Sequence, residues 1–491
     1  MKSLAHSALL ACSFVAAAQG AVVPRTLGPV LVTLGGLTFI NKGLVAVGTI
    51  SAQLRDTLGE TIGGIGSAIA LEPGTFTKQS GTYSGTLITQ PDRGHNTEGT
   101  IDYRARRQYF DFTFAPYYGT GKLPFDVGTK TLKLTYRRTA LTFDRKRGRT
   151  TGLDALGVRP QTPGYPQNPF ADPPIPIANA TYNHLTIDAE GLVINKDGSY
   201  FVSDEYGPYI YRFRRDGTLL STIQPPEALV PLIGGSLNFT SAINPDTGRT
   251  PNQGFEGLTI SPNGRYLYAM LQSATIQDGG SSKSTNRYTR LFKYVVSGNS
   301  RPKLEGEWIV PLPQTSKGTT LAQSEIHYLN KNQFLVLSRD GNGHGGDSTQ
   351  SSYKQADLFD ISKATDIHGS KFDGLTPVAP KGVLDPSITP AAYASFVNYL
   401  DPDQLGRFGL QNGGAKDKTL ISAKWESFAL APVLDRSFPN DYFLFTMTDN
   451  DFITINGSAA GVPYVDPYGQ DVDTQAFVFR VTLPNVEKFN V

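Results

Sequence analysis

The sequence of 491 residues contains one cysteine, three methionines, two tryptophans and six histidines, and its formal net charge is only +2. The single cysteine, Cys12, lies in the apolar N-terminal stretch. If that stretch is removed, the mature chain has neither a disulfide nor a reactive thiol, and a chain of this length can bury a core without such crosslinks. The near-neutral charge and the absence of a basic tail argue against nucleic acid as a partner.

Long hydrophobic runs are also missing. Residues 1–20 combine Lys2, a short apolar run and small residues near a cleavage point, which predicts a secretory signal peptide. No later segment offers about 18 uninterrupted apolar residues, so we expect no membrane span. The segment 30–50 is interrupted by glycines, Asn41 and Lys42, and it is interpreted as strands. The expected product is one secreted domain, residues 21–491.

Several catalytic signatures are absent as well. The sequence has no G-x-S-x-G nucleophile elbow, no H-E-x-x-H zinc helix and no phosphate-binding P-loop. A stretch beginning at Asp340 starts like a calcium loop, but Ser351 stands where its twelfth-position glutamate should be. No organic cofactor is expected.

What the sequence does contain is a long repeat. A Glu-headed strand, a turn and a second strand ending in a polar loop recur from Glu190, Glu256, Glu325 and Glu426, with a looser copy at 67–92. A third strand rich in aromatic and basic residues follows each copy, for example at 209–213 and 476–481. The best helix-period stretch is 390–400. This pattern predicts an all-β fold, a β-propeller of six blades with long loop insertions on one face. Five blades are visible, and 120–180, together with 30–38, could supply the sixth.

Acids recur at two positions of the repeat. The strand-heading glutamates would form a ring around the propeller axis, and a hard cation such as Ca²⁺ would relieve the repulsion in that ring. A second set lies in the loops after the second strands. The alternative for both sets is structural, with glutamates accepting backbone N–H groups and aspartates stabilising turns. The predicted catalytic residues are Glu190, Glu256, Glu325, Glu426, Asp204 and Asp340, and the predicted metal ligands are Glu190, Glu256, Glu325, Glu426, Asp449 and Asp451.

Basic residues occur in or near the same loops. Carboxylates for a metal together with basic groups for oxyanions would suit a phosphate ester, and they would equally form a structural salt-bridge network. The predicted substrate-binding residues are Arg93, His95, Arg290, Arg339 and Lys424. Sequons at Asn179, Asn238 and Asn456 predict N-glycosylation.

Three motifs carry a resemblance to a known family. The segments 91–96 (Pro-Asp-Arg-Gly-His-Asn), 190–207 and 255–265 (Phe-Glu-Gly-Leu-Thr-Ile-Ser-Pro-Asn-Gly-Arg) resemble the phytase-like family, also described as esterase-like activity of phytase. The resemblance covers roughly residues 50–485 and implies a β-propeller that hydrolyses phosphate esters or other esters, with a small anionic or ester substrate. It assigns no catalytic residues. Two other readings stay open, a non-catalytic extracellular binding propeller and a lactonase-type hydrolase.

Overall fold

The computed structural model describes residues 28–95, 99–161, 172–297 and 301–488. The predicted signal peptide, Cys12 and residues 162–171 lie outside these residues. Helices are few and short, namely α1 (Phe125–Gly128), α2 (Pro402–Arg407) and the 3₁₀ turns η1 (Arg145–Arg147), η2 (Glu227–Leu229), η3 (Lys371–Asp373) and η4 (Pro380–Gly382). In the described part of the chain, no helix is long and apolar enough to cross a membrane.

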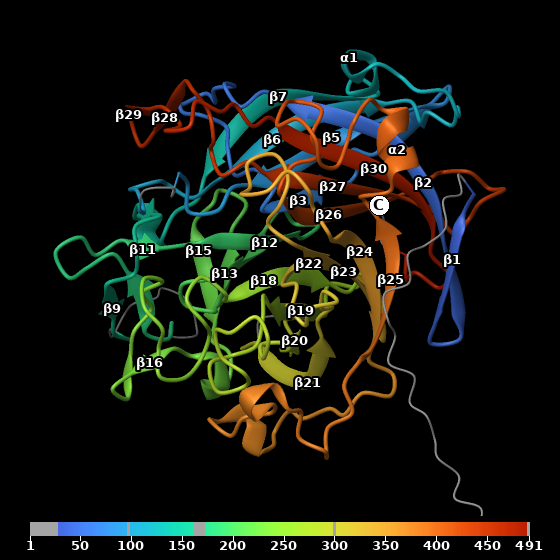
Figure 1. Cartoon of the computed structure of the whole chain (residues 1–491). Helices are drawn as coiled ribbons and strands as arrows, with labels where there is room; N and C mark the ends of the chain where they lie inside the picture. Colours follow the sequence, from blue (N-terminus) through green and yellow to red (C-terminus); the bar gives the residue numbers. More distant parts are fainter. Residues whose placement is uncertain (1–27, 96–98, 162–171, 298–300, 489–491) are drawn as a thin grey trace, which may run out of the picture.

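Five large antiparallel sheets surround a common centre (Figure 1). We name each blade by its innermost strand. The β3 blade contains β3 (Ala68–Leu71), β5 (Thr82–Gln90), β6 (Arg106–Phe114) and β7 (Leu132–Leu141), with β4 (Thr77–Gln79) paired to β5. The β12 blade contains β12 (Ala189–Ile194), β13 (Tyr200–Asp204), β14 (Ile210–Phe213) and β15 (Leu219–Ile223). The β18 blade contains β18 (Phe255–Ile260), β19 (Tyr266–Leu271), β20 (Tyr288–Val295) and β21 (Lys303–Pro311).

The last two blades differ in how they are built. The β22 blade contains β22 (Gln323–Asn330), β23 (Gln333–Arg339), β24 (Lys354–Asp360) and β25 (Ala392–Asn398). The β26 blade contains β26 (Lys424–Pro432), β27 (Asp441–Asp449), β30 (Thr474–Thr482), β2 (Leu37–Ile50) and β1 (Val30–Leu34). Strand β2 pairs antiparallel with β30, so the first and last parts of the described chain share one sheet.

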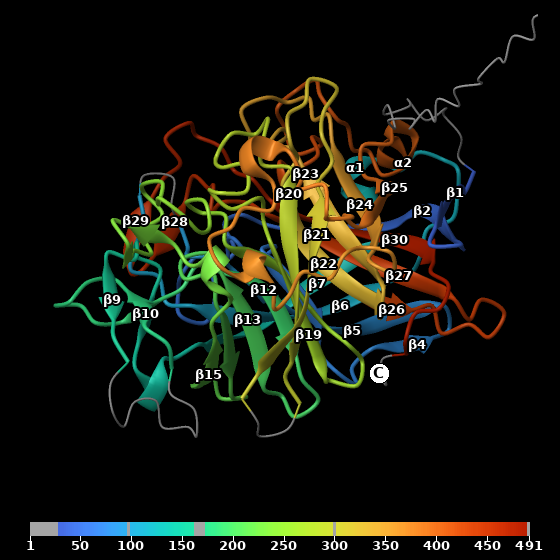
Figure 2. The ribbon, with the colours of Figure 1, turned by 90° about the horizontal axis from the view of Figure 1, so that it is seen from below.

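The described inner strands form a closed cycle of five, in the order β3, β12, β18, β22, β26 and back to β3. The prediction of a β-propeller is therefore confirmed, whereas this cycle has five members where the sequence predicted six blades. The stretch expected to form the sixth supplies β7 and a small sheet of β8 (Thr150–Thr151), β11 (Leu185–Thr186), β10 (Ile175–Ile177) and β9 (Gly157–Arg159). Both views place this small sheet at the periphery (Figures 1 and 2).

Alternating apolar residues explain why these segments form blades. Each face of a sheet packs against the next blade, and one hydrophobic cluster fills each of the five interfaces. Ile88 and Leu192 belong to the cluster between the β3 and β12 blades, and Ile69 and Met447 to the one between the β3 and β26 blades. The core therefore lies between neighbouring blades, and the polar ends of the inner strands are left to face one another.

The stretch 390–400 is a strand, not a helix. Its central part forms β25, which pairs with β24 at the edge of its sheet. Phe396 and Val397 are buried there. Pairing with β24 as the fourth strand of the sheet thus outweighs the weak helical periodicity of this stretch. Two short hairpins complete the described strands, β16 (Leu232–Ile233) with β17 (Ser236–Leu237), and β28 (Gly457–Ala459) with β29 (Val462–Tyr464).

Candidate functional site

Three inner strands begin with a β-bulge that carries a glutamate. In β18, Phe255 pairs with Leu271 and Gly257 with Met270, which leaves Glu256 without a register partner. The same shift in β26 leaves Glu426 unpaired, and the shift in β12 spans Glu190. A bulge redirects a side chain at the end of a strand. These three glutamates lie close enough to influence one another, since Glu256 and Glu426 both raise the pKa of Glu190, after the larger effect of burial.

Glu325 does not belong to this ring. In β22 the pairs are Gln323 with Ser338 and Glu325 with Leu337, so Ser324 occupies the bulge position and Glu325 aligns with Gly257. An offset of one residue turns a side chain to the other face. The carboxylate of Glu325 accepts the N–H groups of Leu258 at 3.0 Å and Ile326 at 2.7 Å. Its predicted place in the ring is therefore corrected to a contact between two neighbouring blades.

The same registers define two further positions in each of four blades. One lies two residues before the bulge residue of the inner strand, and the other lies opposite that position on the second strand. Backbone bonds link these two positions, for example from Glu205 N to Asp188 O at 3.0 Å and from Gln272 N to Gly254 O at 3.0 Å. With the bulge residue, the sets are Asp188, Glu190 and Glu205; Gly254, Glu256 and Gln272; Ala322, Ser324 and Arg339; and Lys424, Glu426 and Asp449.

The β12 blade is acidic at all three positions. Carboxylate oxygens of Asp188, Glu190 and Glu205 lie within 4.8 Å of one another, and all three side chains are buried. Burial raises the pKa of Glu205 to about 8, the charge of Asp188 adds to the rise, and the charge of Arg93 opposes it. Burial and then the charge of Glu205 likewise raise the pKa of Glu256 well above its usual range.

The β26 blade contains a built-in counter-ion. Lys424 Nζ lies 2.5 Å from Asp449 Oδ2, 2.8 Å from Asp451 Oδ1 and 3.6 Å from Glu426 Oε1. Arg339 from the neighbouring blade bonds Glu426 as well. Burial raises the pKa of Asp449 to about 7, although Lys424 opposes this rise. For Asp451, burial acts to raise the pKa, but the charge and hydrogen bond of Lys424 together with the charge of Arg339 outweigh burial, and the pKa falls below the usual range. Asp449 and Asp451, predicted as metal ligands, are thus paired with a lysine.

The loop after β27 holds Asp451 in an uncommon backbone conformation. Asp451 and Phe452 have φ angles of 49° and 56°, in the left-handed region that non-glycine residues seldom occupy. The N–H of Asp451 donates to Asp449 Oδ1 at 2.7 Å. Phe452 packs so closely on Gly63 that a Cβ there would lie 2.6 Å from the ring. Packing therefore fixes a strained turn that presents Asp451 to Lys424.

Arg93, in the loop after β5, belongs to the same group of charged side chains, which we name the central cluster. The central cluster comprises Arg93, Asp188, Glu190, Glu205, Glu256, Arg339, Lys424, Glu426, Asp449 and Asp451. Arg93 Nη1 lies 3.2 Å from Asp188 Oδ2 and 3.1 Å from Ser241 Oγ. The adjacent Asp92 is buried, and its pKa is raised well above the usual range by burial and by the charges of Asp449 and Asp188. Asp188 was not among the residues predicted from the sequence. Through its contact with Arg93, it connects the loop after β5 to the β12 blade. Its spacing, two residues before the strand-heading Glu190, is the sequence feature that could have predicted its place in the cluster.

Asp204 and Asp340 have structural surroundings. Asp204 accepts the N–H of Asp188 at 2.8 Å, the N–H of Gly207 at 3.1 Å and the hydroxyl of Tyr211 at 3.2 Å. Asp340 accepts the Ser351 hydroxyl at 2.7 Å and the N–H of Ser352 at 2.6 Å. The register shows why the prediction was displaced, because Glu205 and Arg339, not Asp204 and Asp340, occupy the positions shared with Gln272 and Asp449.

The two remaining basic predictions, Arg290 and His95, contact other residues. Arg290 is 0% exposed, and its guanidinium bonds Asp278 and Glu307, each at 2.7 Å. It therefore has no surface for a substrate, and its predicted role is corrected to a buried ion pair. The ring of His95 stacks on Tyr464, with 4.1 Å between the ring centres.

Some polar atoms of the cluster have no hydrogen-bond partner among the described residues. They include two donors, Nε of Arg93 and Nε of Arg339, and two acceptors, Oε1 of Glu205 and Oε2 of Glu256. The side chains of Arg93, Arg339 and Lys424 are 13%, 14% and 26% exposed, so solvent reaches their edge of the cluster. Buried polar groups in native proteins are nearly always paired, and this group is therefore a candidate for ligand binding.

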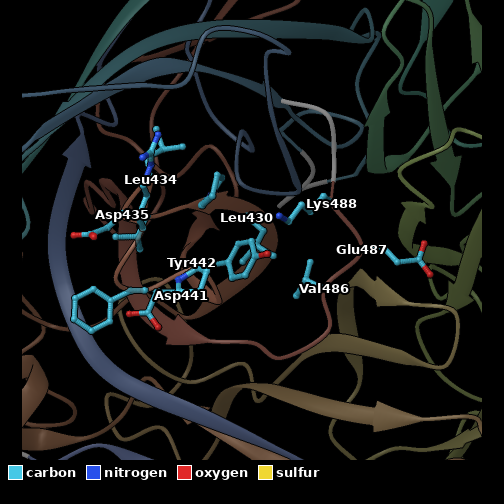
Figure 3. A pocket seen from close by; sticks show the side chains of 13 residues that line it. Leu430, Leu434, Asp435, Asp441, Tyr442, Val486, Glu487 and Lys488 are labelled. Atoms are coloured by element: carbon cyan, nitrogen blue, oxygen red, sulfur yellow. The ribbon is translucent and has the colours of Figure 1, made fainter.

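Two cavities lie elsewhere. One, of about 320 Å³, is lined by Leu430, Tyr442, Val486 and neighbouring residues (Figure 3). Strand β26 begins at the cluster and ends beside this cavity, so the two are roughly 20 Å apart at about 3.3 Å per residue. The other, of about 360 Å³, is lined by Pro225, Tyr294, Leu304 and others. Neither contains a residue of the central cluster.

The chain is similar to one curated protein and to several solved structures. An uncharacterized secreted protein of Arthroderma benhamiae is 40% identical over 467 residues, which cover 87% of this chain and 90% of that protein. Among solved structures, a luciferin-regenerating enzyme aligns over 91% of this chain and 97% of its own, with 11% identity and a TM-score of 0.27. A putative 6-phosphogluconolactonase from Bacteroides fragilis aligns over 89% and 90%, with 10% identity and a TM-score of 0.26.

The family model described as esterase-like activity of phytase matches residues 81–452, most of the chain. This range begins at β5 in the β3 blade, spans the β12, β18 and β22 blades and reaches the loop of Asp449 and Asp451 in the β26 blade. It therefore includes the residues of the central cluster. The chain belongs to the phytase-like family.

Proposed function

We propose that the protein is a secreted hydrolase that cleaves phosphate esters or other esters at the central cluster. The observation that carries this proposal is the set of unpartnered groups. Two guanidinium donors, on Arg93 and Arg339, stand beside two carboxylate acceptors, on Glu205 and Glu256. A bound oxyanion and an attacking water would satisfy both kinds of group. The family's description, esterase-like activity of phytase, supports the same class of reaction.

The roles follow from the chemistry of these groups. Glu256 Oε1 accepts Gln272 Nε2 at 3.0 Å, which orients the carboxylate and leaves Oε2 for a proton. As general base, Glu256 takes a proton from water while the water oxygen bonds to phosphorus or carbonyl carbon. The bond to the alcohol oxygen then breaks, and the alcohol oxygen takes up the proton that Glu256 accepted from the water. Arg93 and Arg339 stabilise the negative charge that develops on the substrate oxygens.

The test is turnover of phytate, p-nitrophenyl phosphate, p-nitrophenyl acetate and a simple lactone, with and without added Ca²⁺. Glu256→Gln keeps the size of the side chain, and we expect kcat to fall by roughly 10²–10⁴-fold. Glu325→Gln is the matched control, since Glu325 lies at a similar point of the neighbouring inner strand but faces another blade.

Two outcomes would contradict the proposal. A Glu256→Gln variant that melts at a lower temperature but remains active would make Glu256 a structural residue. A wild-type protein that turns over none of the four substrates would favour a non-catalytic binding propeller.

Export and glycosylation belong to the same proposal. The Arthroderma relative is called a secreted protein. Asn456 is exposed, next to β28, whereas the side-chain oxygens of Asn179 and Asn238 accept backbone N–H groups of their own turns. We expect Asn456 to be the most accessible acceptor. Loss of a mass shift on peptide-N-glycosidase treatment of Asn456→Gln, with retention in Asn238→Gln, would support this order.

A further inference from the structure

The three acids of the β12 blade stand at positions that the other blades fill differently. The β18 blade has glycine, glutamate and glutamine there, and the β22 blade has alanine, serine and arginine. The fold therefore does not require acids at these positions. In the β12 blade alone, Asp188, Glu190 and Glu205 are acidic together, which calls for an explanation beyond the packing of blades.

We propose that Asp188, Glu190 and Glu205 bind one hard divalent cation, such as Ca²⁺, beside the carboxylate of Glu256. The inference deepens the proposed function by adding a cation to the same site, and it rests on that function only for the cation's role in hydrolysis. It also revises the predicted ligand set, because Glu325, Asp449 and Asp451 have other partners.

The spacing of the carboxylates fits such an ion. Calcium binds oxygen at about 2.3–2.6 Å, so ligand oxygens on opposite sides of the ion lie about 5 Å apart. The three carboxylate oxygens here lie within 4.8 Å of one another. This separation does not exceed the distance that one calcium ion can bridge. Only oxygen ligands are present, which favours Ca²⁺, Mg²⁺ or Mn²⁺ over softer metals.

Glu256 supplies an independent sign of a ligand. Its side chain is buried, with the residue 2% exposed, and Oε2 has no hydrogen-bond donor among the described residues. Its carboxylate lies beside that of Glu205, whose own Oε1 also lacks a donor. Two buried carboxylates that face each other without a donor need a positive charge or a proton between them.

The protein's own cations neutralise only part of this group. Arg93 contacts Asp188 and Ser241. The guanidinium of Arg249 donates to the backbone carbonyls of Tyr206, Phe239 and Thr240. The described acids of the β12 blade thus keep an excess of negative charge that the β26 blade avoids with Lys424. A bound cation would also polarise an ester oxygen held by Arg93.

The experiment measures cation binding without substrate. Full-length secreted protein is treated with EDTA, dialysed and titrated with CaCl₂ by isothermal calorimetry, and parallel titrations use MgCl₂ and MnCl₂. We expect one site in the wild type. Glu190→Gln and Glu205→Gln should each weaken binding by roughly 100-fold or more. Even mutation of residues that only hydrogen-bond to metal ligands lowers metal affinity by about 10–100-fold. Glu325→Gln is the matched control and should bind like the wild type.

Three results would overturn the inference. They are no binding of any of the three cations to wild type, undiminished binding in Glu190→Gln or Glu205→Gln, or loss of binding in Glu325→Gln. Circular dichroism establishes that each variant is folded, and if one glutamine variant does not fold, the other decides. Cation binding without turnover would refute the proposed hydrolase and leave the site intact. Turnover in EDTA by a protein that binds no cation would refute the site and leave the hydrolase intact.

Discussion

The β12 and β26 blades place side chains at the same three register positions but balance their charges in different ways. The β26 blade has Lys424 where the β12 blade has Asp188, and this lysine contacts three carboxylates. The β12 blade has acids at all three positions. The comparison teaches that the repeat sets where polar groups meet, whereas single residues decide whether the protein or a ligand supplies the counter-charge.

The largest expected effect comes from removing the counter-charge of the β26 blade. Lys424→Met leaves Asp449, Asp451 and Glu426 near one another without their lysine. Breaking a buried ion pair from one side costs about 3–5 kcal/mol. Urea unfolding should show a loss of this size both with and without Ca²⁺. Lys418→Met, which breaks an exposed pair with Asp126, is the control and should leave the free energy of unfolding close to the wild-type value. A loss equal to that of the control would mean that Lys424 does not hold the blade together.

Glu325→Gln should have the next largest effect. The carboxylate bonds two backbone N–H groups, one of them in the neighbouring blade, and weakening such charge-assisted bonds costs about 1–3 kcal/mol. The free energy of unfolding should fall by this amount whether or not Ca²⁺ is present, and kcat should stay at the wild-type value. A loss of activity at a temperature where the variant is folded would return Glu325 to the central site.

The opposite sign is expected in the β12 blade. Glu190→Gln removes one charge from a buried group that already has too many, so in EDTA we expect the variant to gain about 1–2 kcal/mol. In excess Ca²⁺ the order should reverse, because only the wild type gains binding energy. Thermal melts of both proteins in EDTA and in CaCl₂ test this reversal. Destabilisation of the variant in both buffers would show that Glu190 is a structural residue like Glu325.

A neutral site in the β22 blade sharpens the comparison. Burial raises the pKa of Asp357 to about 7, although the hydroxyls of Tyr353 and Tyr393 donate to it at 2.6 and 2.8 Å. Because the folded pKa lies above the unfolded one, Asp357 contributes stability at low pH that is lost as pH rises through about 7. Between pH 6 and 8 the loss is about 1 kcal/mol.

The measurement for this site is the pH dependence of unfolding in EDTA. Asp357→Asn removes the titrating group, so its stability should fall less steeply than that of the wild type over this range. Identical slopes in the two proteins would mean that Asp357 titrates at its ordinary value.

Much of the fold followed from local pattern. The Glu-headed strands, their partners and the aromatic third strands appear as expected, for example in β12, β13 and β14. The number of blades did not, because the stretch after β7 contains short strands whose place depends on contacts across the molecule. The closed cycle of inner strands leaves no gap for them.

The sequence predicted which strand ends meet at the central cluster, but some of the predicted residues are one position away from those that lie there. Glu190, Glu256 and Glu426 meet as predicted because each sits at a bulge. Glu325, Asp204 and Asp340 fit the spacing equally well, yet the bulge in β22 falls one residue before Glu325. The shared loop position falls one residue after Asp204, at Glu205, and one residue before Asp340, at Arg339. Bulge placement depends on how two strands pair, which a single strand's sequence does not contain. Pairing also made Asp188 part of the cluster.

The pairing of β2 with β30 has a consequence for how the protein folds during synthesis. Val47 finds its partner, Phe477, only when almost the whole chain has been synthesised. Contacts this distant in sequence slow folding, and until they form β2 remains an unprotected edge. The β26 blade is complete only after this pairing, so the acids of the early blades and the lysine of the last one come together late in synthesis. A truncated or stalled product without β30 would therefore carry most residues of the central cluster but lack a complete β26 blade.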